Sequence, residues 1–215
     1  RELGQCVDGG VGEPDEAEGE GPQKPARDRF GKKEAARMRS LPEKSLAALL
    51  RAAGASGART IGLKPIASGA VATAEGLRNE DACALLAAMN QELPYALVNP
   101  VVLAPAVAPH IALAEAGLAL DVAALHARCL PALARPHDVA VVEGAGGWRV
   151  PLNHAETLAD LARRLGFPVV LVVGLRLGCI NHALLTAEAV RADGLRLAGW
   201  VANQVDPGMA NLADN

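Results

Sequence analysis

Four apolar runs in the chain are each followed by a polar side chain or a flexible backbone. The positions that follow the runs 59–63, 139–142, 168–173 and 195–201 are Lys64, Glu143, residues 174–182 and Asn203. Ligands of open parallel sheets bind beyond the carboxyl ends of the strands, because these ends meet at one rim. The spacing therefore predicts a binding or catalytic site made from these four positions.

Lys64 has the chemistry of a phosphate or carboxylate partner. It is the only lysine after Lys44, and the other eleven basic side chains of that part are arginines. A compact ammonium suits a point contact with an anion, whereas arginine suits forked, planar contacts. The alternative is an ordinary surface lysine at a strand end.

Two carboxylates are candidates for a metal site. Glu143 precedes a turn, 144–147, with three glycines in four residues. A carboxylate there can hold a hydrated magnesium ion, and the glycines let backbone amides approach an anion. Asp81 lies in the first turn of an expected helix, where it can also simply complement the helix dipole. A purely structural role for Glu143 is the other interpretation.

The segment 177–182 places Gly178 and Asn181 at an expected helix start. Free amides and the positive end of the dipole make such a start a site for a carboxylate or phosphate. The alternative is that Asn181 only caps the helix. The five histidines show no spacing typical of metal ligands.

The elements that must position these residues alternate along the chain. Short apolar runs joined by helices predict an α/β fold with a parallel sheet buried on both faces. The helices are expected at 45–53, 79–89, 109–117, 121–133, 156–165 and 180–192. Residues 93–109, with four prolines, are expected to form an extended loop.

Composition restricts the class of protein. The 215 residues are 51% hydrophobic with a net charge of -3, which allows a full-sized core and disfavours nucleic-acid binding. No apolar stretch is long enough for a membrane span, so a cytoplasmic protein is expected. Residues 1–45 carry 19 charges and few large apolar side chains, and we expect a disordered tail there before an α/β domain at 46–215. The four cysteines form no CxxC pair.

Seven motifs together resemble the ATP-dependent dethiobiotin synthetase family over about residues 46–207. They are KPIASG at 64–69, GLRNEDA at 76–82, VNP at 98–100, PHIA at 109–112, VEGAGGW at 142–148, VVGLRLGCINH at 172–182 and LAGWVAN at 197–203. The resemblance implies a homodimeric, P-loop NTPase-like three-layer α/β sandwich of biotin biosynthesis. Such an enzyme closes a ureido ring on diaminopelargonic acid with CO2, ATP and Mg2+. A chromosome-partition ATPase is the weaker alternative, because it leaves GCINHALLT unexplained.

The resemblance also implies roles for single residues. Lys64 would stabilise the carbamate and the γ-phosphate, Asp81 and Glu143 would hold magnesium, and Asn203 would read adenine. The substrate would be lined by Ser68, Gly144, Ala145, Gly146 and Gly147. Its distant carboxylate would be received, across the dimer interface, by Leu177, Gly178, Cys179, Ile180 and Asn181.

Two departures from the family pattern concern the ends of the chain. The family begins with a strand and a GxxxxGK[ST] loop, whereas residues 38–45 read MRSLPEKS and keep neither glycine. The first β-α unit is therefore expected to be replaced, and the Lys44–Ser45 pair is not taken as equivalent to the lysine of that loop. The family also continues beyond the point where this chain ends at Asn215. A catalytically impaired relative that keeps the dimer and substrate surfaces is the alternative function.

Overall fold

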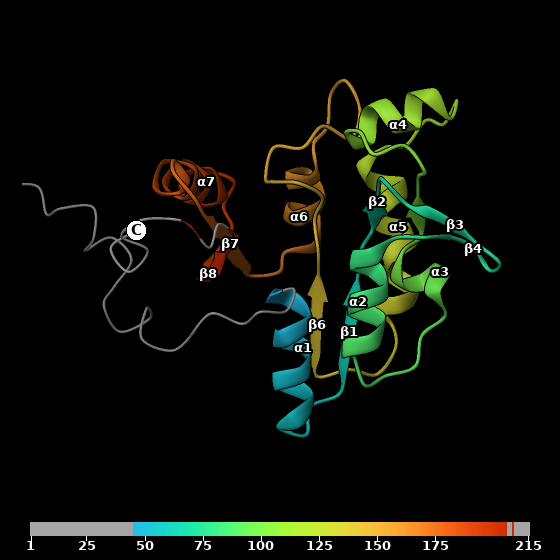
Figure 1. The fold of residues 1–215 in the computed structure, drawn as a ribbon, viewed down its shortest axis with the longest axis horizontal. Coiled ribbons are helices and arrows are strands. Elements are labelled where there is room, and N and C mark those ends of the chain that lie inside the picture. The colour runs from blue at the N-terminus through green and yellow to red at the C-terminus, as the bar shows by residue number, and fades with distance from the viewer. Residues whose placement is uncertain (1–44, 206–207, 209–215) are drawn as a thin grey trace, which may run out of the picture. The chain divides into compact units, whose positions relative to one another are not determined.

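The computed structural model describes residues 45–205 and 208, which belong to the compact unit formed by residues 37–215 (Figure 1). The expectation of a disordered tail at 1–45, and that of a replaced phosphate loop at 38–45, fall almost wholly outside the described residues.

Helices and parallel strand pairs alternate along the described residues, as the sequence predicts. The helices are α1 (Ser45–Ala55), α2 (Glu80–Ala88), α3 (Tyr95–Val98), α4 (Pro109–Glu115), α5 (Val122–Leu133), α6 (Leu158–Leu165) and α7 (Cys179–Ala192). The strands are β1 (Thr60–Leu63), β2 (Ile66–Ala67), β3 (Val71–Thr73), β4 (Gly76–Arg78), β5 (Val101–Val102), β6 (Val139–Val142), β7 (Val169–Leu175) and β8 (Leu197–Gln204). The mixed α/β class is thereby confirmed.

Three of the four strand pairs within the described residues are parallel. β1 pairs with β6, β2 with β5 and β7 with β8, whereas β3 and β4 form an antiparallel hairpin. Parallel strands need crossover connections, which the helices between them provide. None of the helices within the described residues has both the length and the apolar character that a bilayer span requires.

The start of the β1–β6 pair is fixed by an ion pair on the surface. The Arg59 guanidinium donates two hydrogen bonds to the Asp138 carboxylate, at 2.8 and 3.0 Å, and the Arg59 backbone N–H donates a third at 2.9 Å. These hydrogen bonds hold the pKa of Asp138 well below its usual range. Arg59 and Asp138 thus align the two strands whose carboxyl ends carry Lys64 and Glu143.

Two sequence expectations about elements are wrong. Residues 93–109 are not one extended loop, because they contain α3 and β5, and β5 pairs with a strand β2 that the sequence did not reveal. The sixth helix begins at Leu158 rather than at 156, because Thr157 and Asp160 form a capping box there. Short elements that depend on a distant partner give little signal in the sequence.

The lack of a side chain at Gly62 lets Leu50 of α1 and Leu85 of α2 pack closely on β1. A Cβ at Gly62 would lie 2.9 Å from Leu50 Cδ1 and 3.0 Å from Leu85 Cβ, and both leucines are buried. We expect Gly62→Ala to lower the free energy of unfolding by about 1–3 kcal/mol, as overpacking does. Urea titration measures the change, with Gly199→Ala as the matched control because a Cβ on that β8 glycine would meet nothing within 4 Å. Equal midpoints for the two variants would contradict the close approach of helix and strand.

Candidate active site

Lys64 is the centre of the candidate site. Its Nζ donates hydrogen bonds to Asp81 Oδ2 at 3.0 Å, to Glu143 Oε1 at 2.8 Å and to the Gly144 carbonyl oxygen at 2.7 Å. The residue is only 4% exposed. A buried ammonium is stable only when it is paired and hydrogen-bonded, and three acceptors satisfy all three of its donors. Lys64 is therefore not the ordinary surface lysine that the sequence left open.

Three different elements bring this cluster together. Lys64 follows β1 directly, and the Glu143 backbone N–H donates to the Leu63 carbonyl at 2.8 Å, so the parallel ladder extends to the glutamate. Asp81 lies in the first turn of α2, where the Asn79 side chain accepts hydrogen bonds from two backbone amides of that turn. The rim position predicted for Lys64 and Glu143 is thus confirmed, and Asn79 is the N-cap that the sequence predicts.

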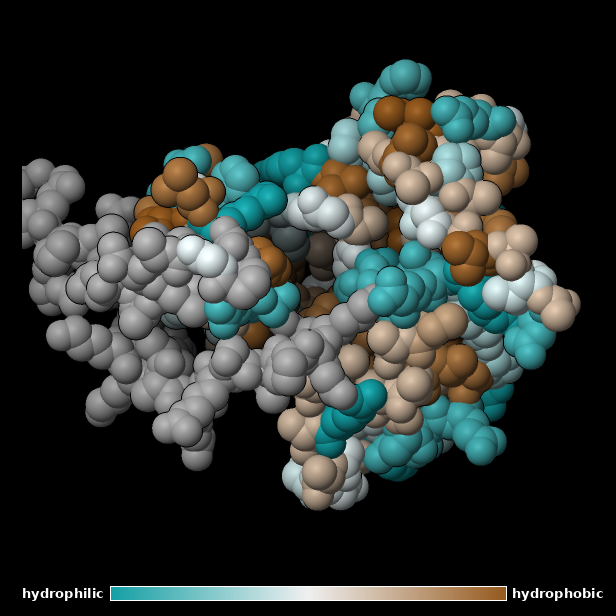
Figure 2. All heavy atoms as spheres, in the orientation of Figure 1, coloured by the Kyte–Doolittle hydropathy of each residue, from teal (hydrophilic) through white to brown (hydrophobic). Residues whose placement is uncertain are grey.

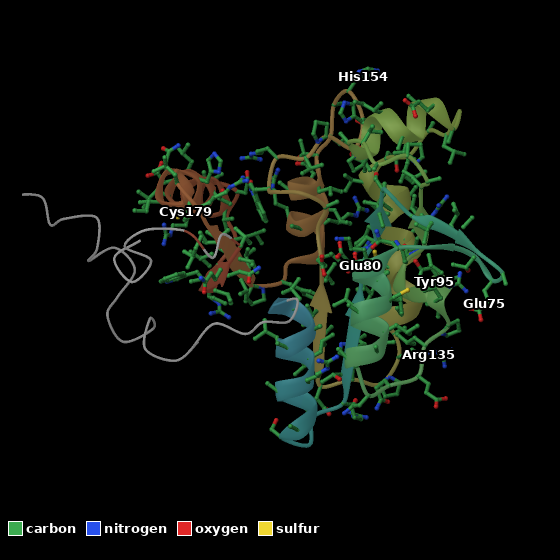
Figure 3. The ribbon with its side chains drawn as sticks, in the orientation of Figure 1. Glu75, Glu80, Tyr95, Arg135, His154 and Cys179 are labelled. Carbon is green, nitrogen blue, oxygen red and sulfur yellow. The ribbon has the colours of Figure 1, made fainter. Side chains whose placement is uncertain are left out.

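A chain of hydrogen bonds behind Lys64 was not predicted. The Asn79 backbone N–H donates to the Tyr95 hydroxyl at 2.7 Å, which donates to Asn99 Oδ1 at 3.0 Å. Asn99 Nδ2 donates to the Lys64 carbonyl oxygen at 2.6 Å. Figure 3 shows Tyr95 on α3. Asn79 and Asn99 are buried, so this network holds the Lys64 backbone and the start of α2 in fixed positions. Asn99 belongs to the VNP motif at 98–100 and Asn79 to GLRNEDA at 76–82, but neither motif predicted this network.

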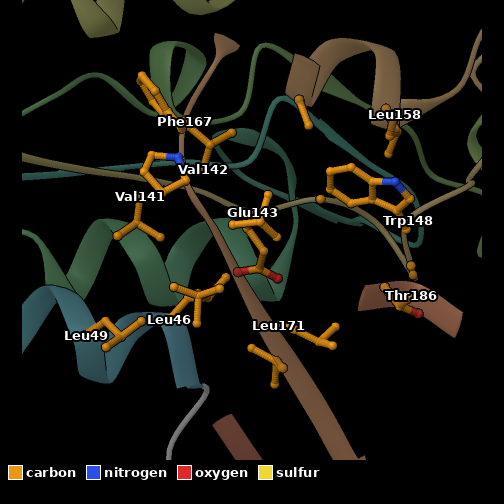
Figure 4. A pocket seen from close by; sticks show the side chains of 18 of the residues that line it. Leu46, Leu49, Val141, Val142, Glu143, Trp148, Leu158, Phe167, Leu171 and Thr186 are labelled. Atoms are coloured by element: carbon orange, nitrogen blue, oxygen red, sulfur yellow. The ribbon is translucent and has the colours of Figure 1, made fainter. Parts of the chain in front are cut away.

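The glycine turn after Glu143 borders a large cavity. The cavity measures about 1140 Å3, and its lining includes Glu143, Gly144, Gly146 and Gly147. Figure 4 shows the Glu143 side chain among the lining side chains, and the space-filling view is hollowed in the same region (Figure 2). Gly146 and Gly147 have backbone φ angles of 78° and 142°, which residues with a side chain rarely adopt. At these two glycines the turn therefore borders the cavity with backbone that carries no side chain.

Trp148 and Arg149, which follow this turn, are both hydrogen-bonded to Asp193. The Trp148 indole N–H donates to Asp193 Oδ2 at 2.7 Å, and Arg149 Nη2 donates to Asp193 Oδ1 at 2.9 Å. Burial raises the pKa of Asp193, but these two hydrogen bonds and the charges of Arg149 and Arg163 together outweigh it and leave the pKa below its usual value. The contact joins residues 45 apart in the chain, and no motif indicated it.

The start of α7 differs from the expectation in one respect. Gly178, with a φ of 91°, is the N-cap residue, and Asn181 lies inside the first turn with an exposed side chain. The interpretation that Asn181 caps the helix is therefore wrong, and its side chain is available to a ligand or partner. Leu177 is 97% exposed and Ile180 50% exposed. Cys179, which is labelled on α7 in Figure 3, is buried and belongs to the lining of the cavity.

Ser68 and Asn203 make no direct hydrogen bond to Lys64, Asp81 or Glu143 within the described residues, but the Ser68 carbonyl oxygen accepts one at 3.3 Å from Asn79 Nδ2, at the N-cap of the helix that carries Asp81. Ser68 Oγ is buried and has no hydrogen-bond partner there, which is unusual for a buried hydroxyl. Asn203 does not follow the last strand but lies inside β8, opposite Gly174 of β7. The sequence placed the strand end three residues too early.

Asp81 and Glu143 form an acidic pair that suits a hydrated divalent cation. Both carboxylates contact one ammonium, so they converge on a common positive charge. Magnesium is usually held by one or two carboxylates together with water and phosphate oxygens. Within residues 45–205 and 208, no group of three or more His, Cys, Asp or Glu side chains is arranged to hold a metal. A hydrated cation held by this pair would take its remaining ligands from water or from a bound phosphate.

Comparison with known proteins identifies the class. A family model described as an AAA domain matches residues 44–213. Together with the parallel strand pairs and the rim site, this match defines an ATP-binding α/β protein with the fold of P-loop NTPases.

Three curated relatives narrow the class to one family. The ATP-dependent dethiobiotin synthetase BioD of Pseudomonas paraeruginosa is 59% identical over 169 residues, which cover 79% of this chain and 74% of the relative. Synthetases of the same name from Cellvibrio japonicus and Marinobacter nauticus are 56% and 55% identical, over 78% and 73% of this chain and 73% and 67% of the relatives. The chain belongs to the ATP-dependent dethiobiotin synthetase family, as the motifs indicated.

Proposed function

We propose that this chain catalyses the ATP-dependent closure of a ureido ring on diaminopelargonic acid. One amine takes up CO2 as a carbamate and loses a proton, and a carbamate oxygen then attacks the γ-phosphorus of ATP and releases ADP. The second amine attacks the carbamate carbon, expels phosphate and loses a proton, which gives dethiobiotin. The observation that carries the proposal is the Lys64 ammonium held between Asp81, Glu143 and the Gly144 carbonyl.

Lys64 is the group that stabilises negative charge on the carbamate and on the transferring phosphoryl group. Phosphoryl transfer needs positioning and charge stabilisation more than covalent participation by the protein. Asp81 and Glu143 would hold Mg2+, which supplies further neutralisation of the phosphate oxygens when bound. A bound anion would compete with the Asp81 and Glu143 carboxylates for the Lys64 ammonium, and a bound cation would compete with the ammonium for the carboxylates. The same three side chains would therefore serve both the free and the ligand-bound protein.

The substrate-binding proposal uses the remaining motif residues. Ser68 and the turn formed by Gly144, Ala145, Gly146 and Gly147 would line the reacting end of diaminopelargonic acid, and the unpartnered Ser68 hydroxyl supports this role. The helix start formed by Leu177, Gly178, Cys179, Ile180 and Asn181 would receive the distant carboxylate from a neighbouring subunit of a homodimer. The exposed side chains of Leu177 and Ile180, at the start of α7, support an interface there. Asn203 would contact adenine.

The finer architecture is also a proposal. The strand pairs would belong to one three-layer sandwich, with a first β-α unit that departs from the family pattern. Residues 38–45 lack both glycines of GxxxxGK[ST], and Pro42 has no backbone N–H. This observation favours, as a second candidate function, an impaired relative that binds ATP weakly.

The two candidates differ in turnover and in nucleotide affinity. The full chain is supplied with ATP, Mg2+, bicarbonate and diaminopelargonic acid, and dethiobiotin and phosphate are quantified. The matched variant carries a GxxxxGKT segment in place of residues 36–43, which puts the loop lysine two residues before Lys44. We expect it to bind ATP at least tenfold more tightly in calorimetry, because several amides then meet the phosphates at once. Dethiobiotin from neither protein would overturn the proposed synthetase. Product from the repaired variant alone would establish the impaired relative.

A further inference from the structure

The Tyr95 hydroxyl lies where hydrogen bonds from two parts of the candidate site meet. It accepts the Asn79 backbone N–H at 2.7 Å and donates to Asn99 Oδ1 at 3.0 Å. Asn79 is the N-cap of α2, the helix that carries Asp81. Asn99 Nδ2 in turn donates to the Lys64 carbonyl oxygen at 2.6 Å. One hydroxyl therefore connects the backbone of Lys64 with the helix start that holds Asp81.

The direction of each hydrogen bond in this chain is fixed by the groups themselves. A backbone amide can only donate, so the Tyr95 hydroxyl accepts from Asn79 and gives its single proton to Asn99 Oδ1. The Asn99 amide nitrogen then donates to the carbonyl oxygens of Lys64 and Val101, at 2.6 and 3.1 Å. Burial raises the pKa of Tyr95, so the hydroxyl keeps the proton that it donates.

The surroundings of Tyr95 hold its ring in one place. The Arg78 guanidinium lies over the ring, 4.2 Å from its centroid, and forms an ion pair with Glu75 at 3.1 Å. Asn79 is 8% exposed and Asn99 2% exposed. Water can therefore hardly replace the hydroxyl, and loss of the hydroxyl would leave a buried donor and a buried acceptor unsatisfied.

We propose that Tyr95 is a positioning residue, whose hydroxyl sets the place of the Lys64 ammonium relative to the Asp81 carboxylate. The proposal rests on the proposed function, in which Lys64 meets the transferring phosphoryl group and Asp81 holds Mg2+. Lys64 Nζ lies 3.0 Å from Asp81 Oδ2, and the chain through Tyr95 joins the same two residues from behind. A misplacement of about 1 Å at a reacting group can lower a rate on the order of a hundredfold, so a loosened chain should be visible in turnover.

Tyr95→Phe tests this role, because phenylalanine keeps the ring beside Arg78 and removes only the hydroxyl. In a turnover-competent chain, with the glycine loop restored if needed, we expect kcat to fall about tenfold. The Mg2+ concentration for half-maximal rate should rise about tenfold, as it does when a group behind a metal ligand is lost. KM for diaminopelargonic acid should change little, since Tyr95 acts through Lys64 and Asp81 rather than on the substrate.

The Lys64 ammonium reports on the same chain without turnover. Lys64 Nζ donates three hydrogen bonds and the residue is 4% exposed, so its protons should exchange slowly with water. In nitrogen-15 NMR its signal is identified by its loss in Lys64→Met. We expect exchange of these protons to become about tenfold faster in Tyr95→Phe, because the cluster opens more often when its support is gone.

Two further variants separate positioning from general stability. Asn99→Leu breaks the same chain, so the double variant with Tyr95→Phe should lose little more kcat than the more impaired single variant. Thr157→Ala removes the capping box of α6 and should lower Tm, while kcat and the Lys64 signal stay unchanged.

An unchanged Lys64 signal in both Tyr95→Phe and Asn99→Leu would overturn the positioning role. Equal effects of Thr157→Ala on kcat and on the Lys64 signal would overturn it as well, because the losses would then follow stability alone. If neither the parent chain nor the chain with the restored loop makes dethiobiotin, the proposed function fails, and the Lys64 signal alone decides whether Tyr95 positions the ammonium.

Discussion

Lys64→Met lowers kcat for dethiobiotin formation by about 30- to 150-fold, which corresponds to roughly 2–3 kcal/mol of lost transition-state stabilisation. Methionine keeps most of the length of the side chain and removes only the ammonium that contacts Asp81, Glu143 and Gly144. The lost charge acts mainly while the phosphoryl group moves, so KM for diaminopelargonic acid should change little. Steady-state kinetics of a turnover-competent chain, with the glycine loop restored if needed, measures both constants. An unchanged kcat would contradict the role proposed for Lys64.

Loss of the ammonium should also make the stability of the Lys64→Met variant depend on pH. This effect reports on the lost charge rather than on the changed shape of the side chain. Without it, the Asp81 and Glu143 carboxylates face each other with no positive charge between them, and their mutual repulsion destabilises the folded variant. This repulsion is strongest at high pH and is relieved as the pH falls and a proton neutralises one carboxylate, so the variant regains stability toward low pH. The difference in Tm between the parent chain and Lys64→Met should therefore shrink between pH 8 and pH 5. Lys64→Met combined with Asp81→Asn is the control in which this pH dependence disappears.

The site could be predicted from the sequence where a reactive side chain stands directly beside a strand or helix that the local sequence already indicates. Lys64 and Glu143 each follow an aliphatic run, and the parallel pairing of β1 with β6 brings them within hydrogen-bond distance. Asn79 before a helical segment predicts its own capping role, which the structure confirms. In these cases a few neighbouring residues determine the geometry, so the pattern is sufficient.

The remaining contacts depend on residues far apart in the chain. The Trp148–Asp193 hydrogen bond and the Tyr95–Asn99–Lys64 network join separate elements, and each partner alone looks like an ordinary polar side chain. The two strands of the β3–β4 hairpin contain only three residues each, which is too short for a clear alternation of apolar and polar side chains. Long-range pairing, rather than local propensity, decides these parts of the fold.

Asn181→Ala raises the apparent KM for diaminopelargonic acid by about 30- to 150-fold and leaves kcat nearly unchanged, since it removes binding that is equal in the ground and transition states. The side chain is exposed in the first turn of α7, beside the amides that follow Gly178. Asn181→Asp keeps the size but adds a negative charge, so repulsion of the substrate carboxylate should raise KM further. A KM for Asn181→Asp at or below that of Asn181→Ala would exclude a carboxylate at this position.

Mixing two defective chains shows which subunit supplies Asn181. If each site combines Lys64 of one subunit with Asn181 of its neighbour, a mixed dimer of Lys64→Met and Asn181→Ala chains contains one site with both defects and one intact site. Random reassortment of equal amounts should then recover about one quarter of the parent turnover at low substrate, although each variant alone is nearly inactive there. If both residues serve the same subunit, every site carries one defect and no activity returns. Recovery thus requires a substrate site that spans two chains, and its absence in verified mixed dimers would place Asn181 in its own subunit's site.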